Sequence, residues 1–76
     1  MTTVRFALQQ TSPVRLAIYN ALGNEVRLVL AGYLPPGEHL AQWDGIDNHG
    51  HAADQGVYFY RLEGPDFHTV RKLVHK

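Results

Sequence analysis

The sequence predicts an all-β domain, folded as an antiparallel β-sandwich of about six to seven strands. Three observations support this prediction. Apolar and polar residues alternate in six separate runs, which is the period of a strand with one buried face. Turn-forming residues separate these runs at intervals of about eight to twelve residues. No window has the apolar spacing of an amphipathic helix longer than about two turns. A small barrel is the alternative arrangement of the same strands.

The first three runs occupy residues 3–10, 13–20 and 25–30, and we expect them to form a meander. The turn before the third run contains Gly23 and Asn24, which tolerate positive φ. The alternation predicts one inward face, made of Val4, Phe6, Leu8, Val14, Leu16, Ile18, Val26, Leu28 and Leu30.

The last three runs occupy residues 37–44, 56–63 and 67–76, and the turn "GPD" is expected to join the final two as a hairpin. The alternation places Ala41 and Trp43 on the inner face of the first of these strands. In the second, it predicts an inner face of Tyr58, Tyr60 and Leu62 and an outer face of Val57, Phe59 and Arg61.

One local pattern favours the immunoglobulin-like form of the sandwich. Gly56 stands just before a strand in which Tyr58 precedes Tyr60 by two positions, in the style of a tyrosine corner. The chain has no cysteine, so we expect Tyr60 and Trp43 to fill the centre that a disulfide occupies in antibody domains.

Composition limits the classes of function. With 76 residues, positions 1–76 are expected to form a single domain. Seven Lys and Arg balance seven Asp and Glu, so the sequence predicts no binding to nucleic acid. The longest uncharged run, residues 28–37, is too short and too rich in Pro and Gly to insert into a membrane. The start lacks the pattern of a secretory signal, and we expect the chain to be a piece of a longer protein.

The motif "WDGIDNHGH" at residues 43–51 is the densest polar stretch of the chain. One interpretation is a metal site, with ligands among Asp44, Asp47, Asn48, His49 and His51. The motif lacks the distant glutamate of the known calcium loop, and the two histidines lack a further zinc ligand. We therefore expect no cofactor and no metal.

The preferred interpretation of the same motif is an elaborate turn. Asp44 and Asp47 are expected to accept hydrogen bonds from backbone N–H groups, while Gly45 and Gly50 adopt conformations that other residues avoid. The structural role extends to Trp43, Gly56, Tyr58 and Tyr60 as core and strand-start residues.

The residue content disfavours two further functions. The single serine, Ser12, lies in a turn without a nucleophile motif, so we expect no enzyme. A carbohydrate platform would need a row of exposed aromatic side chains, and its candidates are Trp43, Tyr19, Phe59 and Tyr33. Because Trp43 is in phase with the inner face, packing in the core is the preferred role for it.

Five motifs, in order, resemble one family: "IYNALGNEV", "LPPGEH", "WDGIDNHG", "GVYFYRL" and the ending "RKLV" with a terminal basic residue. The chain resembles, from about Val4 to Lys76, the C-terminal sorting domain of type IX secretion cargo. This immunoglobulin-like family is shared with the flagellar hook-capping protein. The chain lacks the segment rich in Asn and Pro that usually precedes such sorting domains.

The resemblance implies a non-catalytic C-terminal module of an exported bacterial protein, secreted or held at the cell surface. Its implied partners are the outer-membrane secretion machinery and the preceding domain of the parent protein, and we expect a monomer. A structural spacer or a carbohydrate-binding accessory module is the alternative. The residues predicted to contact a partner are the outward Val57 and Phe59 and the basic Arg71, Lys72 and Lys76 of the tail.

Overall fold

A computed structural model describes residues 1–76 and contains six β-strands. The strands are β1 (Thr2–Leu8), β2 (Ser12–Asn20), β3 (Glu25–Leu34), β4 (Gly37–Trp43), β5 (Gly56–Glu63) and β6 (His68–His75). All six predicted runs are therefore strands. The third continues to Leu34, four residues beyond its predicted end at Leu30, before the Pro35–Pro36 turn.

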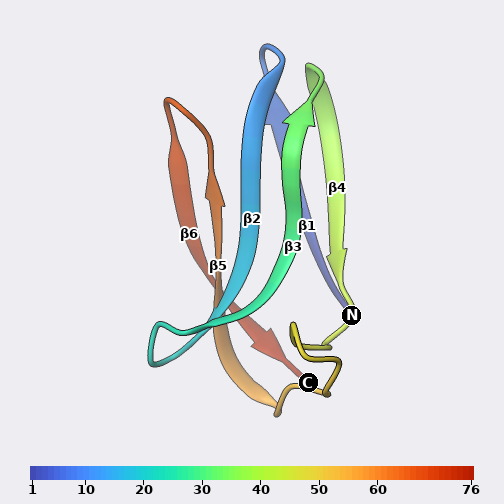
Figure 1. The fold of residues 1–76 in the computed structure, drawn as a ribbon, viewed down its shortest axis with the longest axis vertical. Coiled ribbons are helices and arrows are strands. Elements are labelled where there is room, and N and C mark those ends of the chain that lie inside the picture. The colour runs from blue at the N-terminus through green and yellow to red at the C-terminus, as the bar shows by residue number, and fades with distance from the viewer.

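The strands form two antiparallel sheets that pack as a sandwich (Figure 1). The larger sheet has the order β3-β2-β5-β6, and the smaller one pairs β1 with β4. Both sheets have free edges, so the arrangement is a sandwich and not a closed barrel. The molecule contains no helix of the length and apolar character that crossing a membrane requires.

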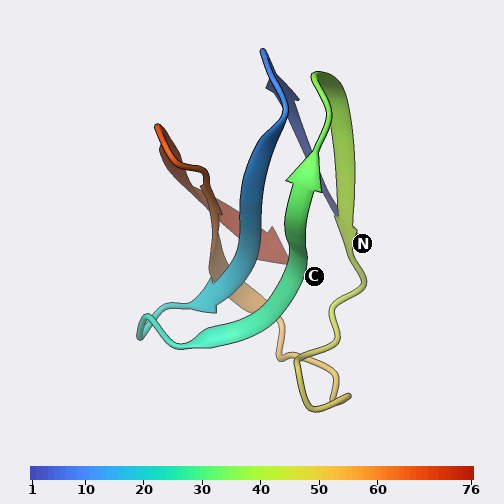
Figure 2. The same ribbon diagram turned by 45° about the horizontal axis from the view of Figure 1, so that its top comes forward.

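The prediction of a meander for the first three strands is wrong. β1 does not pair with β2 but crosses to the second layer, where Val4 pairs with Ala41 of β4. The physical reason is the need to cover the inner face of β2, because Val4 and Leu8 of β1 and Val14 and Leu16 of β2 share one core cluster. Turning Figure 1 by 45° shows β1 behind β2 and β3 (Figure 2).

The inward face of β3 also differs from the prediction. Leu28 is exposed, whereas Val29 packs against both core clusters. The cause is a register shift, since Leu16 pairs with Leu30 and the next residue of β2, Ala17, pairs with Leu28. Val29 is thus the extra residue of a β-bulge, and an extra residue reverses the alternation of the strand that follows.

The core consists of two clusters at the two ends of the sandwich. One contains Val4, Leu8, Val14, Leu16, Ala41 and Leu62, and the other contains Ile18, Trp43, Tyr58 and Leu73. Tyr60 is half-buried and packs against both clusters, close to the central place predicted for it.

Both chain termini lie at the same end of the sandwich (Figure 1). Thr2 pairs with Trp43 in the smaller sheet, and the ring centroid of His75 lies 4.9 Å from that of Trp43. The first and the last strand therefore meet at one tryptophan, next to the loop that joins β4 to β5.

Candidate partner-binding surface

The loop between β4 and β5 is built from side-chain-capped turns. Oδ1 of Asp44 accepts a hydrogen bond from the backbone N–H of Ile46 at 3.0 Å. Oδ1 of Asp47 accepts two, from His49 at 2.8 Å and from His51 at 2.9 Å. These contacts hold the pKa of the Asp47 carboxyl below its usual range, with the backbone hydrogen bond from His51 as the largest cause. Both aspartates thus occupy the turn positions that the sequence indicates.

The glycines of this loop allow its turns. Gly45 has a φ of 81° and Gly50 a φ of 85°, in the left-handed region that side chains disfavour. At Gly45 space is also limiting, because a Cβ atom there would lie 2.6 Å from Cε1 of His75. The structure contains no group of three or more His, Cys, Asp or Glu side chains placed to hold a metal ion.

Asn48 fastens the loop to the free edge of β3. Its backbone N–H donates to the carbonyl of Val26 at 2.8 Å, and its Oδ1 accepts from the N–H of Leu28 at 2.9 Å. Its Nδ2 donates to Oε2 of Glu25 at 3.1 Å. The residue therefore occupies the place of a neighbouring strand along Val26–Leu28. The sequence indicates Asn48 only as a candidate metal ligand. Its role at the edge of β3 was not predicted, because its partners lie far away in the sequence.

Trp43 lies in the core at the base of the loop. It is only 2% exposed, and its Nε1 donates to the carbonyl of Ile46 at 3.0 Å. Its ring meets that of Tyr58 edge-on at 5.4 Å, in addition to its contact with His75. A buried indole has no face for stacking on a sugar, so Trp43 does not form the carbohydrate platform considered for it.

Tyr58 ties the end of the loop to β5. Its hydroxyl donates to the carbonyl of Asp54 at 2.7 Å, four residues earlier in the chain. This is the contact that a tyrosine corner makes. Gly56 begins the strand and pairs with His75 of β6, so the loop, β5 and the end of β6 are joined at this point.

The outward side of the β5–β6 hairpin carries exposed apolar side chains. Val57 is 43% exposed and pairs with Val74, which is 54% exposed. Phe59 is half-buried and pairs with Tyr19 on one side and with Lys72 on the other. We call these side chains, together with Val70, the outer face of β5–β6; its members are Val57, Phe59, Val70, Lys72 and Val74.

A shallow cleft of about 280 Å³ adjoins this face where it meets the β2–β3 turn. The apolar part of its lining consists of Tyr19, Ala21, Phe59 and Val70, and Arg61 also lines it. Such a cleft fits the side chain of a partner protein better than a whole small molecule, because ligand sites usually enclose about 300 to 1,000 Å³.

The cations of the tail are free of internal partners. The ion pairs of the chain join Arg15 to Glu25, Arg27 to Asp44 and Arg61 to Glu63. Arg71, Lys72 and Lys76 are exposed and belong to none of them. Because β6 is an edge strand, these charges stand beside backbone groups that have no neighbouring strand.

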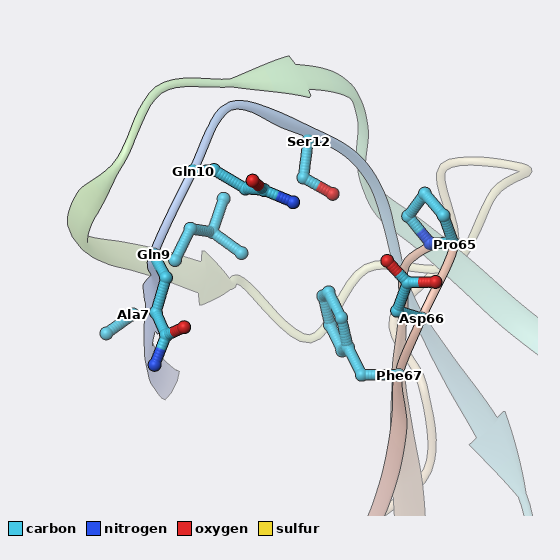
Figure 3. Close-up of a pocket in the computed structure, with 8 residues that line it drawn as sticks. Ala7, Gln9, Gln10, Ser12, Pro65, Asp66 and Phe67 are labelled. Carbon is cyan, nitrogen blue, oxygen red and sulfur yellow. The ribbon is translucent and has the colours of Figure 1, made fainter.

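A larger cleft of about 560 Å³ lies at the opposite end of the molecule, between the β1–β2 and β5–β6 turns (Figure 3). Gln9, Gln10 and Asp66 give it polar walls, and the ring of Phe67 stands at its side. Ser12 lines it, but the hydroxyl donates to the carbonyl of Pro13 at 3.3 Å and no histidine lies in the wall. The cleft therefore lacks the base that a serine nucleophile needs.

Comparison with known proteins identifies the family. The sequence model of the FlgD Ig-like domain matches residues 1–65. The chain belongs to this family. No curated protein and no solved structure matches the chain. The FlgD Ig-like domain is a structural, non-catalytic module, and the match confirms both the immunoglobulin-like sandwich and the kinship with the flagellar hook-capping protein.

The matched range, residues 1–65, includes β1 to β5 of this chain and ends before β6. Arg71, Lys72 and Lys76 lie outside it, whereas Val57 and Phe59 lie inside it. The partner-binding role of these five residues stays a prediction, although the structure brings four of them onto one hairpin and places Lys76 directly after it.

Proposed function

We propose that the chain is a non-catalytic recognition module of a larger exported bacterial protein, read by the outer-membrane machinery of type IX secretion. In this proposal β6 is the strand that is recognised, and the outer face of β5–β6 contacts either the machinery or the preceding domain of the host. The module would then hold its host at the cell surface or release it from there.

One observation carries the proposal: unpaired cations lie on the edge strand β6 and directly after it, and one of them lies among exposed apolar side chains. Arg71, Lys72 and Lys76 have no carboxylate partner, and Lys72 stands between Val70 and Val74 on the outer face. Exposed basic side chains steer a partner, and adjoining apolar area supplies the contact energy. An edge strand also offers backbone hydrogen bonds.

A structural spacer is the second candidate function, and the family match favours it. The match to a structural module covers residues 1–65, and β6 lies outside this range. The position of the termini argues against the spacer function, because Thr2 and His75 both lie next to Trp43. A domain whose ends meet adds little length between its neighbours.

The experiment compares export of a reporter protein fused to this chain in a bacterium with type IX secretion. The test variant carries Arg71→Gln, Lys72→Gln and Lys76→Gln, which remove exposed charge at little cost in stability. The matched control is Arg5→Gln, which removes an exposed, unpaired cation from β1. Thermal unfolding of the purified variants shows that both stay folded.

A sorting module predicts that the triple variant remains inside the cell envelope while the Arg5→Gln control reaches the surface. A second arm places the intact chain between two reporter domains. A spacer keeps its function there, whereas a sorting module read at its end loses it. Export of the triple variant at the level of the unmodified chain contradicts the sorting function.

A further inference from the structure

The free edge of β6 differs from that of β3, the other edge strand of the larger sheet. Along Val26–Leu28 the backbone of β3 already bonds to Asn48, at 2.8 and 2.9 Å. β6 pairs with β5 on one side and has no strand or loop of this kind on the other. We propose that the β6 edge binds an extended, acidic segment of a partner protein as a fifth strand. This inference rests on the proposed function and specifies the chemistry of the partner.

Charge complementarity identifies the partner as acidic. From Phe67 to Lys76 the chain has no aspartate or glutamate, although its net charge is zero. Arg71 and Lys72 are exposed and free of ion pairs. A second copy of the chain is a poor occupant, because antiparallel pairing of two β6 strands sets these cations against each other. A strand with carboxylates at the facing positions removes that repulsion and adds attraction.

The alternation of β6 specifies the order of residues in the partner. Val70, Lys72 and Val74 share the outer face, while Arg71 and Leu73 point to the other side. All strand pairs of this sandwich are antiparallel, and we assign the same direction to the fifth strand. The partner then reads, from its N-terminus, apolar, small, acidic, acidic, apolar.

Each position in that pattern has a physical reason. The two apolar residues lie opposite Val74 and Val70, which are each 54% exposed. The two acidic residues lie opposite Lys72 and Arg71. The small residue lies opposite Leu73, whose side chain is buried and leaves little room beside it. A cross-strand pair contributes only about 0.2 to 1 kcal/mol, so the pattern as a whole is needed for specificity.

β1 and β4 also pair on one side only, and β1 is the competing site because β4 contains no Lys or Arg. The single charged residue of β1 is Arg5, and no pair of adjacent cations is present there. An acidic strand therefore gains less charge contact at β1 than at β6. Binding at β1 is an outcome that the experiment recognises.

The test uses the isotope-labelled 76-residue chain and a synthetic peptide with the core Val-Ala-Glu-Glu-Val between threonine flanks. A matched peptide carries Lys in place of both Glu. Amide hydrogen exchange is followed residue by residue with and without peptide. Strand addition predicts slower exchange at alternate amides from Val70 to His75, because only every second N–H of an edge strand points outward. Docking on side chains alone does not produce this alternation.

Binding affinity gives the second readout. The variant with Arg71→Gln and Lys72→Gln should bind the acidic peptide about fivefold more weakly or worse, as expected for two exposed charge pairs. Arg5→Gln should leave the affinity unchanged, and the lysine peptide should not bind. Added salt should weaken the binding of the acidic peptide, because it screens the charge pairs.

Three results overturn the inference: no protection in β6, protection in β1 instead, or equal affinity of the doubly substituted and unmodified chains. The outcome is separate from that of the export experiment, because the purified chain contains no secretion machinery. If the chain binds the acidic peptide but the triple variant is exported normally, the sorting function is wrong and the binding of an acidic strand to β6 stands. If export is lost in the triple variant but the chain does not bind the acidic peptide, the sorting function stands and the acidic-strand inference is wrong.

Discussion

The imidazole ring of His75 lies against the indole ring of Trp43, with centroids 4.9 Å apart and the planes tilted by 43°. Tyr58 completes this cluster, since its ring lies 6.0 Å from that of His75. The last residue of β6 is thereby held against the core residue that ends β4. The stability of β6 and of the β4–β5 loop should therefore depend on each other.

The first prediction concerns Trp43 itself. Trp43→Ala should destabilise the fold by about 3 to 5 kcal/mol, because it removes a buried ring that contacts the rings of Tyr58 and His75 and donates to a backbone carbonyl. This cost approaches the whole stability of a small domain. Urea denaturation followed by circular dichroism measures it. A variant that unfolds at the same urea concentration as the unmodified chain would show that the indole is dispensable for packing.

The second prediction tests the contact between Gly45 and His75. Gly45→Ala and Gly50→Ala impose similar strain, since both glycines have positive φ, but only the first sets a Cβ atom against the His75 ring. Gly45→Ala should therefore cost about 1 to 3 kcal/mol more, the usual range for overpacking. Adding His75→Ala to each glycine variant should abolish that difference, which a double-mutant cycle of unfolding free energies measures. Equal costs for the two glycine variants would contradict the close approach.

The third prediction tests the hydroxyl of Tyr58. Tyr58→Phe keeps the ring but removes the donor to the Asp54 carbonyl, and it should lower the unfolding free energy by about 0.5 to 1.5 kcal/mol. Tyr33→Phe is the matched control, because Tyr33 is 76% exposed and should leave the denaturation midpoint in place. If the two variants unfold alike, the hydroxyl of Tyr58 does not anchor the loop.

The fourth prediction is a dependence on pH that comes from Asp47. The pKa of this carboxyl is lowered in the folded chain by backbone hydrogen bonds from His51 and His49, so its ionised form stabilises the fold. This stabilisation is complete above the unfolded pKa of about 3.9 and is lost as the pH falls through the lower folded value. Asp47→Asn should therefore flatten the loss of stability below about pH 4.

Urea midpoints at pH 6 and at several values below pH 4 measure this slope. The pKa of Glu25 is also lowered, chiefly by its hydrogen bond from Arg15. Glu25→Gln should therefore independently reduce the loss of stability at acidic pH. If the urea midpoint of Asp47→Asn falls below about pH 4 as steeply as that of the unmodified chain, the two backbone hydrogen bonds to residue 47 do not depend on its charge.

Local alternation was sufficient to predict all six strands and the inward position of Trp43, because a period of two follows directly from strand geometry. It did not predict the bulge at Val29 or the pairing of β1 with β4, since both depend on how distant strands meet. The turn role of Asp47 was predictable because its partners are two and four residues away. Asn48 and His75 were missed for the opposite reason, as each contacts residues far from it in the sequence.

The meeting of the two termini at one end also determines how the domain responds to mechanical load. A pulling force transmitted through segments attached on either side enters at the N and C ends, both at the lower end in Figure 1. Thr2 pairs with Trp43 next to the first end, and Gly56 pairs with His75 next to the second. The force opens each ladder from that end, so hydrogen bonds rupture one after another instead of sharing the load. Tension from the C-terminal side therefore separates β6 from β5, starting at the Gly56–His75 pair. The strand proposed to be recognised is therefore also one that tension applied at the C-terminal side detaches from β5.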